Sequence, residues 1–111
     1  MFIGDNMKIK EGKLLYDSLE LSTLEVELKG TTLLLIEGYN AFFMCGALDV
    51  NIYNSPKMLE RKVICGKAVG VKTIEELLNA SLVQVSNYAK YIGLFEGMKV
   101  YEAFSKLSKE K

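Results

Sequence analysis

The sequence contains no histidine, and this absence removes several classes of function. Histidine is the commonest general base, the commonest metal ligand and the usual pH switch near neutrality. A Ser-His-Asp triad or a Cys-His pair therefore cannot form within the chain or between identical copies of it. Zinc sites built on histidine are excluded, and two cysteines cannot supply a four-cysteine site without oligomerisation. We expect neither a metal nor a cofactor.

A balanced charge and the lack of long apolar runs narrow the possible partners. The chain has 14 Lys and Arg against 14 Asp and Glu, so neither nucleic acid nor an anionic membrane is expected as its main partner. No apolar run approaches the roughly 20 residues that a membrane-spanning helix needs, and no N-terminal signal segment is recognisable. With two cysteines and half of its 111 residues hydrophobic, the chain predicts one packed domain over residues 1–111, located in the cytoplasm.

The first half of the chain predicts β-strands. Over residues 24–29 apolar and charged side chains alternate strictly, so one face of this strand should be buried and the other should carry charge. Residues 33–36 are continuously apolar, as in a strand covered on both faces. With a further strand over residues 41–45, these segments predict an antiparallel β-meander. Its exposed edges favour pairing with another subunit, so residues 1–38 are interpreted as a β-rich self-association region.

Residues 39–111 predict an α/β core. The strand over residues 41–45, a helical stretch and a buried strand over residues 63–71 form a strand–helix–strand unit, whose two strands should be parallel. A capping box from Thr73 to Glu76 predicts a short helix, and further helices are expected over residues 81–92 and 98–107. The expected fold class is therefore α/β (α+β). In it, an N-terminal antiparallel β-meander joins a βαβ unit in one mixed sheet, followed by C-terminal helices.

This topology predicts a crevice between residues 45–49 and residues 70–73. Parallel strands share an edge for their carboxyl ends, and helices are expected to begin there at Ala47 and Thr73. Two helix N-termini, a lysine and a thiol would then surround a pocket suited to an anion or a carbonyl oxygen. The candidate ligand-binding residues are Gly46, Ala47, Gly70, Lys72 and Thr73.

Cys45 and Asp49 are the candidate catalytic residues. Cys45 would act as nucleophile or acid/base, with Asp49 or Lys72 as its proton or charge partner and nearby amides as oxyanion donors. The alternative is structural: Cys45 is then a small buried hydrophobe, Asp49 stabilises a helix dipole and Lys72 is a solvated charge. Cys65 should lie near the start of the second parallel strand, too far from Cys45 for a disulfide.

Two stretches of the chain resemble the YunC-like family, small bacterial and archaeal proteins classed as a domain of unknown function. The stretches are residues 44–50 (Met-Cys-Gly-Ala-Leu-Asp-Val) and residues 66–74 (Gly-Lys-Ala-Val-Gly-Val-Lys-Thr-Ile). The similarity extends more weakly from residue 24 to the C-terminus. The resemblance implies an α/β domain whose N-terminal β region serves self-association, into tetramers, and it implies no established activity.

Two functions remain open from the sequence. One is a homo-oligomeric module, dimer or tetramer, that binds a small anionic ligand or a partner in the crevice and performs no chemistry. The other is a cysteine-dependent enzyme that acts on a small anionic or carbonyl substrate through Cys45. Neither function involves nucleic acid or a membrane.

Overall fold

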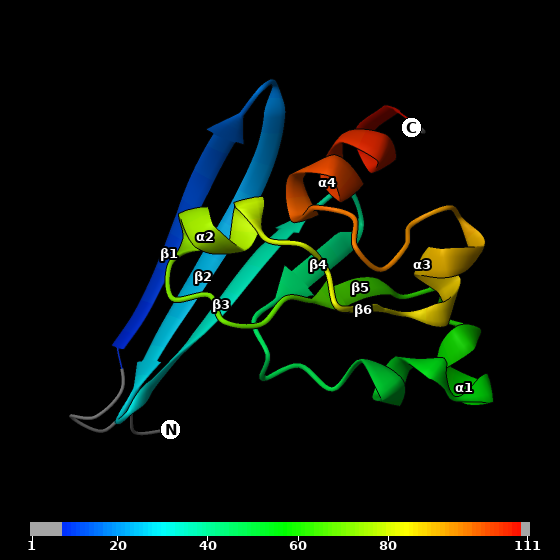
Figure 1. Ribbon diagram of the computed structural model, residues 1–111, viewed down its shortest axis with the longest axis horizontal. Helices are drawn as coiled ribbons and strands as arrows, with labels where there is room; N and C mark the ends of the chain where they lie inside the picture. Colours follow the sequence, from blue (N-terminus) through cyan, green and yellow to red (C-terminus); the bar gives the residue numbers. More distant parts are fainter. Residues whose placement is uncertain (1–7, 110–111) are drawn as a thin grey trace.

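The computed structural model describes residues 8–109, which form one mixed six-stranded sheet flanked by short helices (Figure 1). The strands are β1 (Lys8–Tyr16), β2 (Leu19–Leu28), β3 (Thr31–Gly38), β4 (Ala41–Met44), β5 (Ile64–Lys67) and β6 (Gln84–Val85). The helices are the 3₁₀ helix η1 (Val50–Asn54) and the α-helices α1 (Pro56–Leu59), α2 (Ile74–Asn79), α3 (Asn87–Tyr91) and α4 (Val100–Lys109). Residues 1–7 of the predicted self-association region lie outside the described residues.

The strands lie in the sheet in the same order as in the chain. All neighbouring pairs are antiparallel except β4 and β5, which are parallel and connected through η1 and α1. The predicted fold class is therefore confirmed: a meander and a strand–helix–strand unit share one mixed sheet. Two of the hairpins turn through two residues that both have positive φ, Asp17-Ser18 and Tyr39-Asn40, as tight hairpins between twisted strands require.

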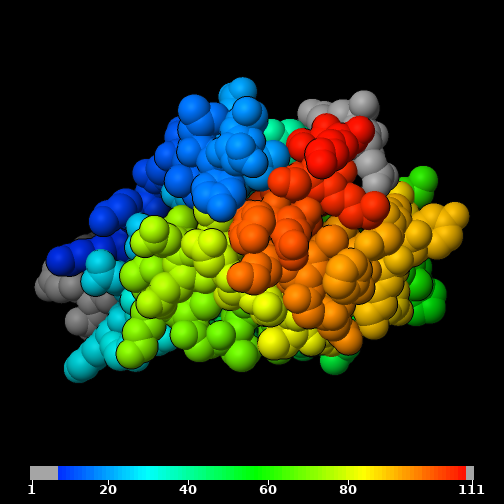
Figure 2. Space-filling model, turned by 45° about the horizontal axis from the view of Figure 1, so that its top comes forward, coloured from blue at the N-terminus to red at the C-terminus, as the bar shows by residue number. Residues whose placement is uncertain are grey.

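The main core lies between one face of the sheet and the helices α2 and α4. Leu34 and Ile36 of β3 and Phe43 of β4 are fully buried there, and the Phe43 ring meets the Phe104 ring of α4 edge-on at 5.0 Å between centroids. Figure 2 shows α2, α4 and the segment between them as a continuous surface that abuts the β1–β2 hairpin. This is the helix-covered face of the sheet.

The opposite face of the sheet is covered at one end only. Over β4 and β5, Val50 and Tyr53 of η1 pack on Phe42 and Cys65, with the Phe42 and Tyr53 rings 5.8 Å apart. Over β1, β2 and β3, none of residues 8–109 forms a comparable layer, and the apolar side chains there are half-buried or exposed. We call this uncovered part the open face.

Three predicted elements differ from the structure. The helix expected from Ala47 begins only at Val50, because residues 45–49 form a turn. The second parallel strand ends at Lys67 instead of residue 71, and Gly70, with φ +75°, then redirects the chain toward α2.

The helix expected over residues 81–92 is replaced by the short strand β6 and the helix α3. The backbone of this segment pairs with the edge of β5, since Val83 N donates to Lys67 O and Ser86 N donates to Cys65 O, both at 2.8 Å. Pairing a free strand edge and burying Leu82 and Val85 outweighs the modest helix propensity of the segment. Within residues 8–109, no helix has the length and apolar character needed to span a bilayer.

Candidate functional site

The chain segments that follow β4 and β5 lie side by side at the carboxyl end of the parallel pair. Ala68 N donates to Met44 O at 3.0 Å, which continues the parallel pairing past the last strand residues. Gly46 then packs against Val69, because a Cβ on Gly46 would lie 3.2 Å from Val69 Cγ1. The predicted parallel pairing is therefore confirmed, and the residue that packs on Gly46 is Val69, just before the predicted Gly70.

The Cys45 side chain points toward β3. Its Sγ accepts a hydrogen bond from Leu34 N at 3.4 Å and lies 4.0 Å from Thr32 O, to which the thiol can donate. The residue is 7% exposed and belongs to the main core. The structure thus gives the thiol the environment of a buried, hydrogen-bonded hydrophobe.

Asp49 uses its carboxylate locally. Its Oδ1 accepts a hydrogen bond from Asn51 N at 3.1 Å, which makes Asp49 the N-cap of η1. Within residues 8–109 no hydrogen bond joins Asp49 to Cys45. The two candidate catalytic residues are therefore close in the chain but engage different parts of the fold.

Backbone amides at the start of α2 donate hydrogen bonds to side chains of the same segment. Thr73 Oγ1 accepts from Glu76 N at 3.0 Å, and Glu76 Oε1 accepts from Lys72 N at 2.7 Å. This is the capping box that the sequence predicted, with the glutamate reaching one residue further back than usual. The backbone amides of Lys72 and Glu76, which the predicted crevice would have left free for an anion, thus donate to side chains of the same chain.

Lys72 does line a hollow, but with different neighbours from those predicted. The hollow measures about 380 Å³ and is lined by Val71, Lys72 and residues 30–32 at the β2–β3 turn. The crevice was predicted from the two parallel strands alone. Antiparallel pairing of β3 with β4 puts the beginning of β3 at the edge where β4 ends, so the topology contained a signal for this turn.

A buried hydroxyl organises the opposite, amino end of β5. Ser86 is fully buried, and its Oγ donates to Val63 O at 2.8 Å while it accepts from Cys65 N and Ala89 N, each at 3.3 Å. Ser86 also caps α3, so one side chain joins β5 to that helix. Nothing in the residue spacing had drawn attention to this serine, because an isolated serine is compatible with any surface turn.

Burial raises the pKa of the Cys65 thiol to about 11, and the hydrogen bond with Ser86 partly offsets this rise. Cys65 is therefore protonated at neutral pH. Both cysteines are free, and Cys65 pairs with Phe42 at the beginning of the parallel pair while Cys45 follows its end. The predicted separation of the two thiols is confirmed.

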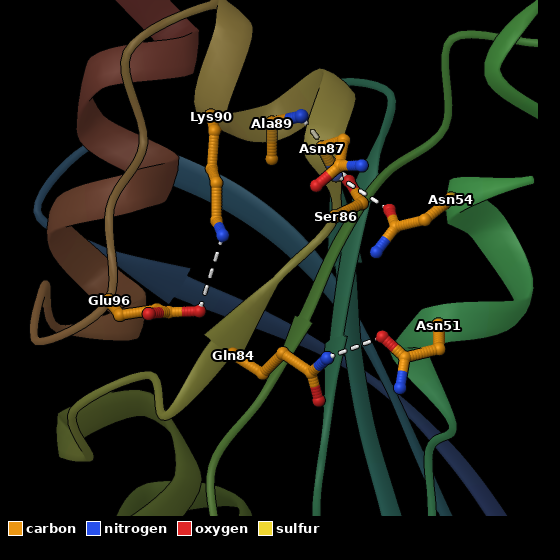
Figure 3. Close-up of polar contacts among 8 residues, drawn as sticks. All are labelled: Asn51, Asn54, Gln84, Ser86, Asn87, Ala89, Lys90 and Glu96. Carbon is orange, nitrogen blue, oxygen red and sulfur yellow. Dashed lines mark hydrogen bonds and ion pairs between the residues drawn. The ribbon is translucent and has the colours of Figure 1, made fainter.

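Two amide contacts fasten η1 to the last strand and to α3 (Figure 3). Gln84 Nε2 donates to Asn51 Oδ1 at 2.9 Å, and Asn87 N donates to Asn54 Oδ1 at 2.8 Å. Because α1 begins directly after η1, these contacts also hold the start of α1 near α3. Among the residues that the structure describes, no cluster of three or more Cys, Asp or Glu side chains could hold a metal ion.

Comparison with known proteins places the chain in a family without an assigned activity. The model of a family described as a domain of unknown function, DUF1805, matches residues 44–107. The uncharacterised protein YunC of Bacillus subtilis (strain 168) is 39% identical over 88 residues, which cover 79% of this chain and 86% of YunC.

A crystal structure of a protein of unknown function, TA1206 from Thermoplasma acidophilum, superimposes with a TM-score of 0.79. It covers 96% of this chain and 99% of its own, at 23% identity, so this likeness shows the fold alone. The family match spans the crevice segments, β5, β6 and most of the helical part, and it leaves β1, β2 and β3 outside. On the family model and the identity to YunC, the chain belongs to the YunC-like DUF1805 family.

Proposed function

We propose that the protein is a homo-oligomeric assembly module whose subunits pack through the open face of β1, β2 and β3. The apolar residues that the strand register puts on this face come from all three strands and are Ile9, Leu15, Leu24, Val26, Leu28, Leu33 and Leu35. Cross-strand pairing aligns them, since Ile9 lies opposite Val26 and Leu24 lies opposite Leu35. Through Met44, the partner of Leu35 on β4, the face continues into the cluster beneath η1.

The observation that carries the proposal is the alternation along β2. Leu24 and Val26 point to the open face. Glu25 and Glu27 point to the helix-covered side, at a part of β2 that does not contribute to the main core. There the two glutamates lie opposite Lys10 and Lys8, as on a solvated surface. In an isolated subunit the apolar side of β2 would thus lack the cover for which its composition is suited.

A second copy of the chain fits this face better than it fits the free edge of β1. The edge strand carries Lys8, Lys10 and Lys13, and charged side chains on an edge oppose strand addition. Two sheet faces instead pack about 10 Å apart with their side chains interdigitated. The rim of the open face bears both signs of charge, at Lys13 and Glu20, which suits a contact between identical surfaces.

Assembly as a dimer or tetramer in the cytoplasm is the form we propose, and the two free thiols agree with a reducing compartment. A cysteine-dependent reaction is not part of the proposal, because the Cys45 thiol is buried and engaged by Leu34 N. Ligand binding by the crevice residues Gly46, Ala47, Gly70, Lys72 and Thr73 stays a prediction.

Multi-angle light scattering of the purified protein tests the assembly. We expect a mass of two or four chains across micromolar concentrations, and a shift to the monomer in the double variant Leu24→Gln, Val26→Gln. The matched control, Glu25→Gln with Glu27→Gln, introduces the same side chains on the other side of the same strand and should keep the assembly. A monomeric native protein, or equal dissociation of both variants, would contradict the proposal.

A further inference from the structure

A second hollow lies at the opposite end of the parallel pair from the predicted crevice. It measures about 510 Å³ and opens where β4 and β5 begin, with Asn40, Phe42, Arg61, Lys62 and Tyr88 among the residues that line it. Figure 1 shows the helices beside it, α1 and α3, at the end of the molecule away from the β1–β2 hairpin. We call this hollow the basic cleft. Its volume lies within the range of small-molecule sites, about 300–1,000 Å³.

The cleft is basic because Arg61 and Lys62 carry the only charges among its lining residues. Both side chains are exposed, and among residues 8–109 neither forms an ion pair with a carboxylate. Adjacent cations without a counter-charge repel each other, so an anion that binds between them relieves this repulsion and gains charge-assisted hydrogen bonds. The guanidinium of Arg61 also matches the planar or tetrahedral oxygens of a carboxylate or phosphate.

The walls of the cleft are held in place by hydrogen bonds that do not involve the cations. Ser86 Oγ bonds to Val63 O at its base, and the contact of Asn54 with Asn87 N ties the η1–α1 segment to the start of α3 (Figure 3). Arg61 N donates to Met58 O and Lys62 N to Leu59 O, which closes the last turn of α1. The backbone around the cleft is therefore fixed by the fold, whereas the exposed Arg61 and Lys62 side chains become ordered when a ligand binds.

Lys62 occupies a backbone position that disfavours its own side chain. Its φ is 55°, in the left-handed region where glycine is the usual residue after a helix. A lysine at this position costs stability relative to glycine, and nothing in its backbone hydrogen bonds requires the side chain. The lysine therefore combines a conformational cost with a place in the wall of the cleft, which is the pattern expected of a functional residue.

Two aromatic residues complete the cleft. Phe42 of β4 and Tyr88 of α3 both line it, and both are only half-buried. Each ring contacts a second aromatic ring: the Phe42 and Tyr53 centroids lie 5.8 Å apart, and the Tyr88 and Tyr91 centroids lie 5.9 Å apart. Phe42 and Tyr88 offer flat apolar surfaces beside the two cations.

From this arrangement we infer that the basic cleft binds a small organic oxyanion, a phosphate or a carboxylate that carries a flat ring. Arg61 and Lys62 hold the charged group, and Phe42 and Tyr88 contact the ring. The inference does not depend on the proposed assembly, because none of the residues that line the cleft belongs to β1, β2 or β3.

An NMR titration of the ¹⁵N-labelled full chain with phenyl phosphate tests the inference. We expect saturable shifts of the amides around Arg61 and Tyr88, with affinity reduced about tenfold or more in Arg61→Gln, the loss typical of one charged hydrogen bond. Lys57→Gln, which removes an exposed cation of α1 outside the cleft, is the matched control and should bind as the native protein does.

Lys62→Gly separates a ligand role from a structural one. Glycine suits the backbone there, so the variant should unfold at the same temperature or a higher one while its affinity for phenyl phosphate falls. Benzyl alcohol, which lacks the charge, should bind more weakly than phenyl phosphate. Absence of saturable shifts, equal loss in Lys57→Gln, or equal binding of benzyl alcohol would overturn the inference.

Discussion

Both ends of the parallel pair β4–β5 use polar side chains as helix caps, and they differ in the charges that line the adjacent hollow: Lys72 alone at the carboxyl end, and Arg61 with Lys62 at the amino end. At the carboxyl end, Asp49 caps η1 and Thr73 caps α2, so the groups that looked available for a ligand are satisfied by the chain itself. At the amino end, Arg61 and Lys62 line a hollow, and within residues 8–109 neither side chain forms an ion pair with a carboxylate. Short helices need caps because a large share of their backbone groups has no intrahelical partner. Asp and Thr side chains that would suit an oxyanion site therefore bind backbone amides of the chain where such helices begin.

The largest effect is expected from breaking the amino end with Ser86→Ala. The buried Cys65 N and Val63 O would lose their shared partner, so the free energy of unfolding should fall by about 1–3 kcal/mol. Urea denaturation followed by circular dichroism measures this loss. Ser108→Ala, which removes a half-buried hydroxyl that donates to Ser105 O within α4, is the control and should change stability much less. Equal losses would mean that Ser86 does not organise this end.

Thr73→Ala sharpens the comparison at the carboxyl end, with a smaller effect. Loss of the N-cap of α2 should lower the free energy of unfolding by about 1 kcal/mol. If the capping groups are structural only, affinity of the basic cleft for phenyl phosphate should not change in this variant. A clear change in that affinity would show that the two ends are coupled, contrary to the description above.

A third effect concerns Cys65 and is confined to alkaline pH. Because its pKa rises from 9.0 to about 11 on folding, the unfolded chain loses this proton first as the pH increases. The contribution to stability is therefore complete below pH 9 and is lost as the pH rises toward 11. Urea midpoints measured across this range should fall more steeply in the native protein and in Cys45→Ala than in Cys65→Ala. The same slope in Cys65→Ala would contradict the assignment.

Sequence reasoning located the sheet better than the helices. The alternation over residues 24–29 and the apolar run over residues 33–36 correspond to β2 and β3, because side-chain period in a strand depends on backbone geometry alone. The helix expected over residues 81–92 failed, since the free edge of β5 recruited residues 83–86 for pairing. The pairing depends on β5, which is distant in the chain, so the sequence of residues 81–92 does not indicate it.

The candidate site was predictable in its backbone but not in its side chains. The proximity of Gly46 to Val69 followed from the parallel topology. The direction of the Cys45 thiol toward Leu34 N depends on the register between β3 and β4, which a single sequence does not specify. The basic cleft brings Arg61 and Lys62 to the same hollow as Tyr88, and because these segments are far apart in the chain no local pattern predicts it.

The identity of strand order and chain order has a consequence for how the molecule folds. Each antiparallel contact from β1 to β4 is closed by a two-residue turn, so these hairpins can form within microseconds and with little loss of chain entropy. The contacts of β5 with β4 and of β6 with β5 form only after the long connections of residues 45–63 and 68–83 have closed. We therefore expect the N-terminal meander to act as the template in the folding reaction, with docking of β5 as the rate-limiting event.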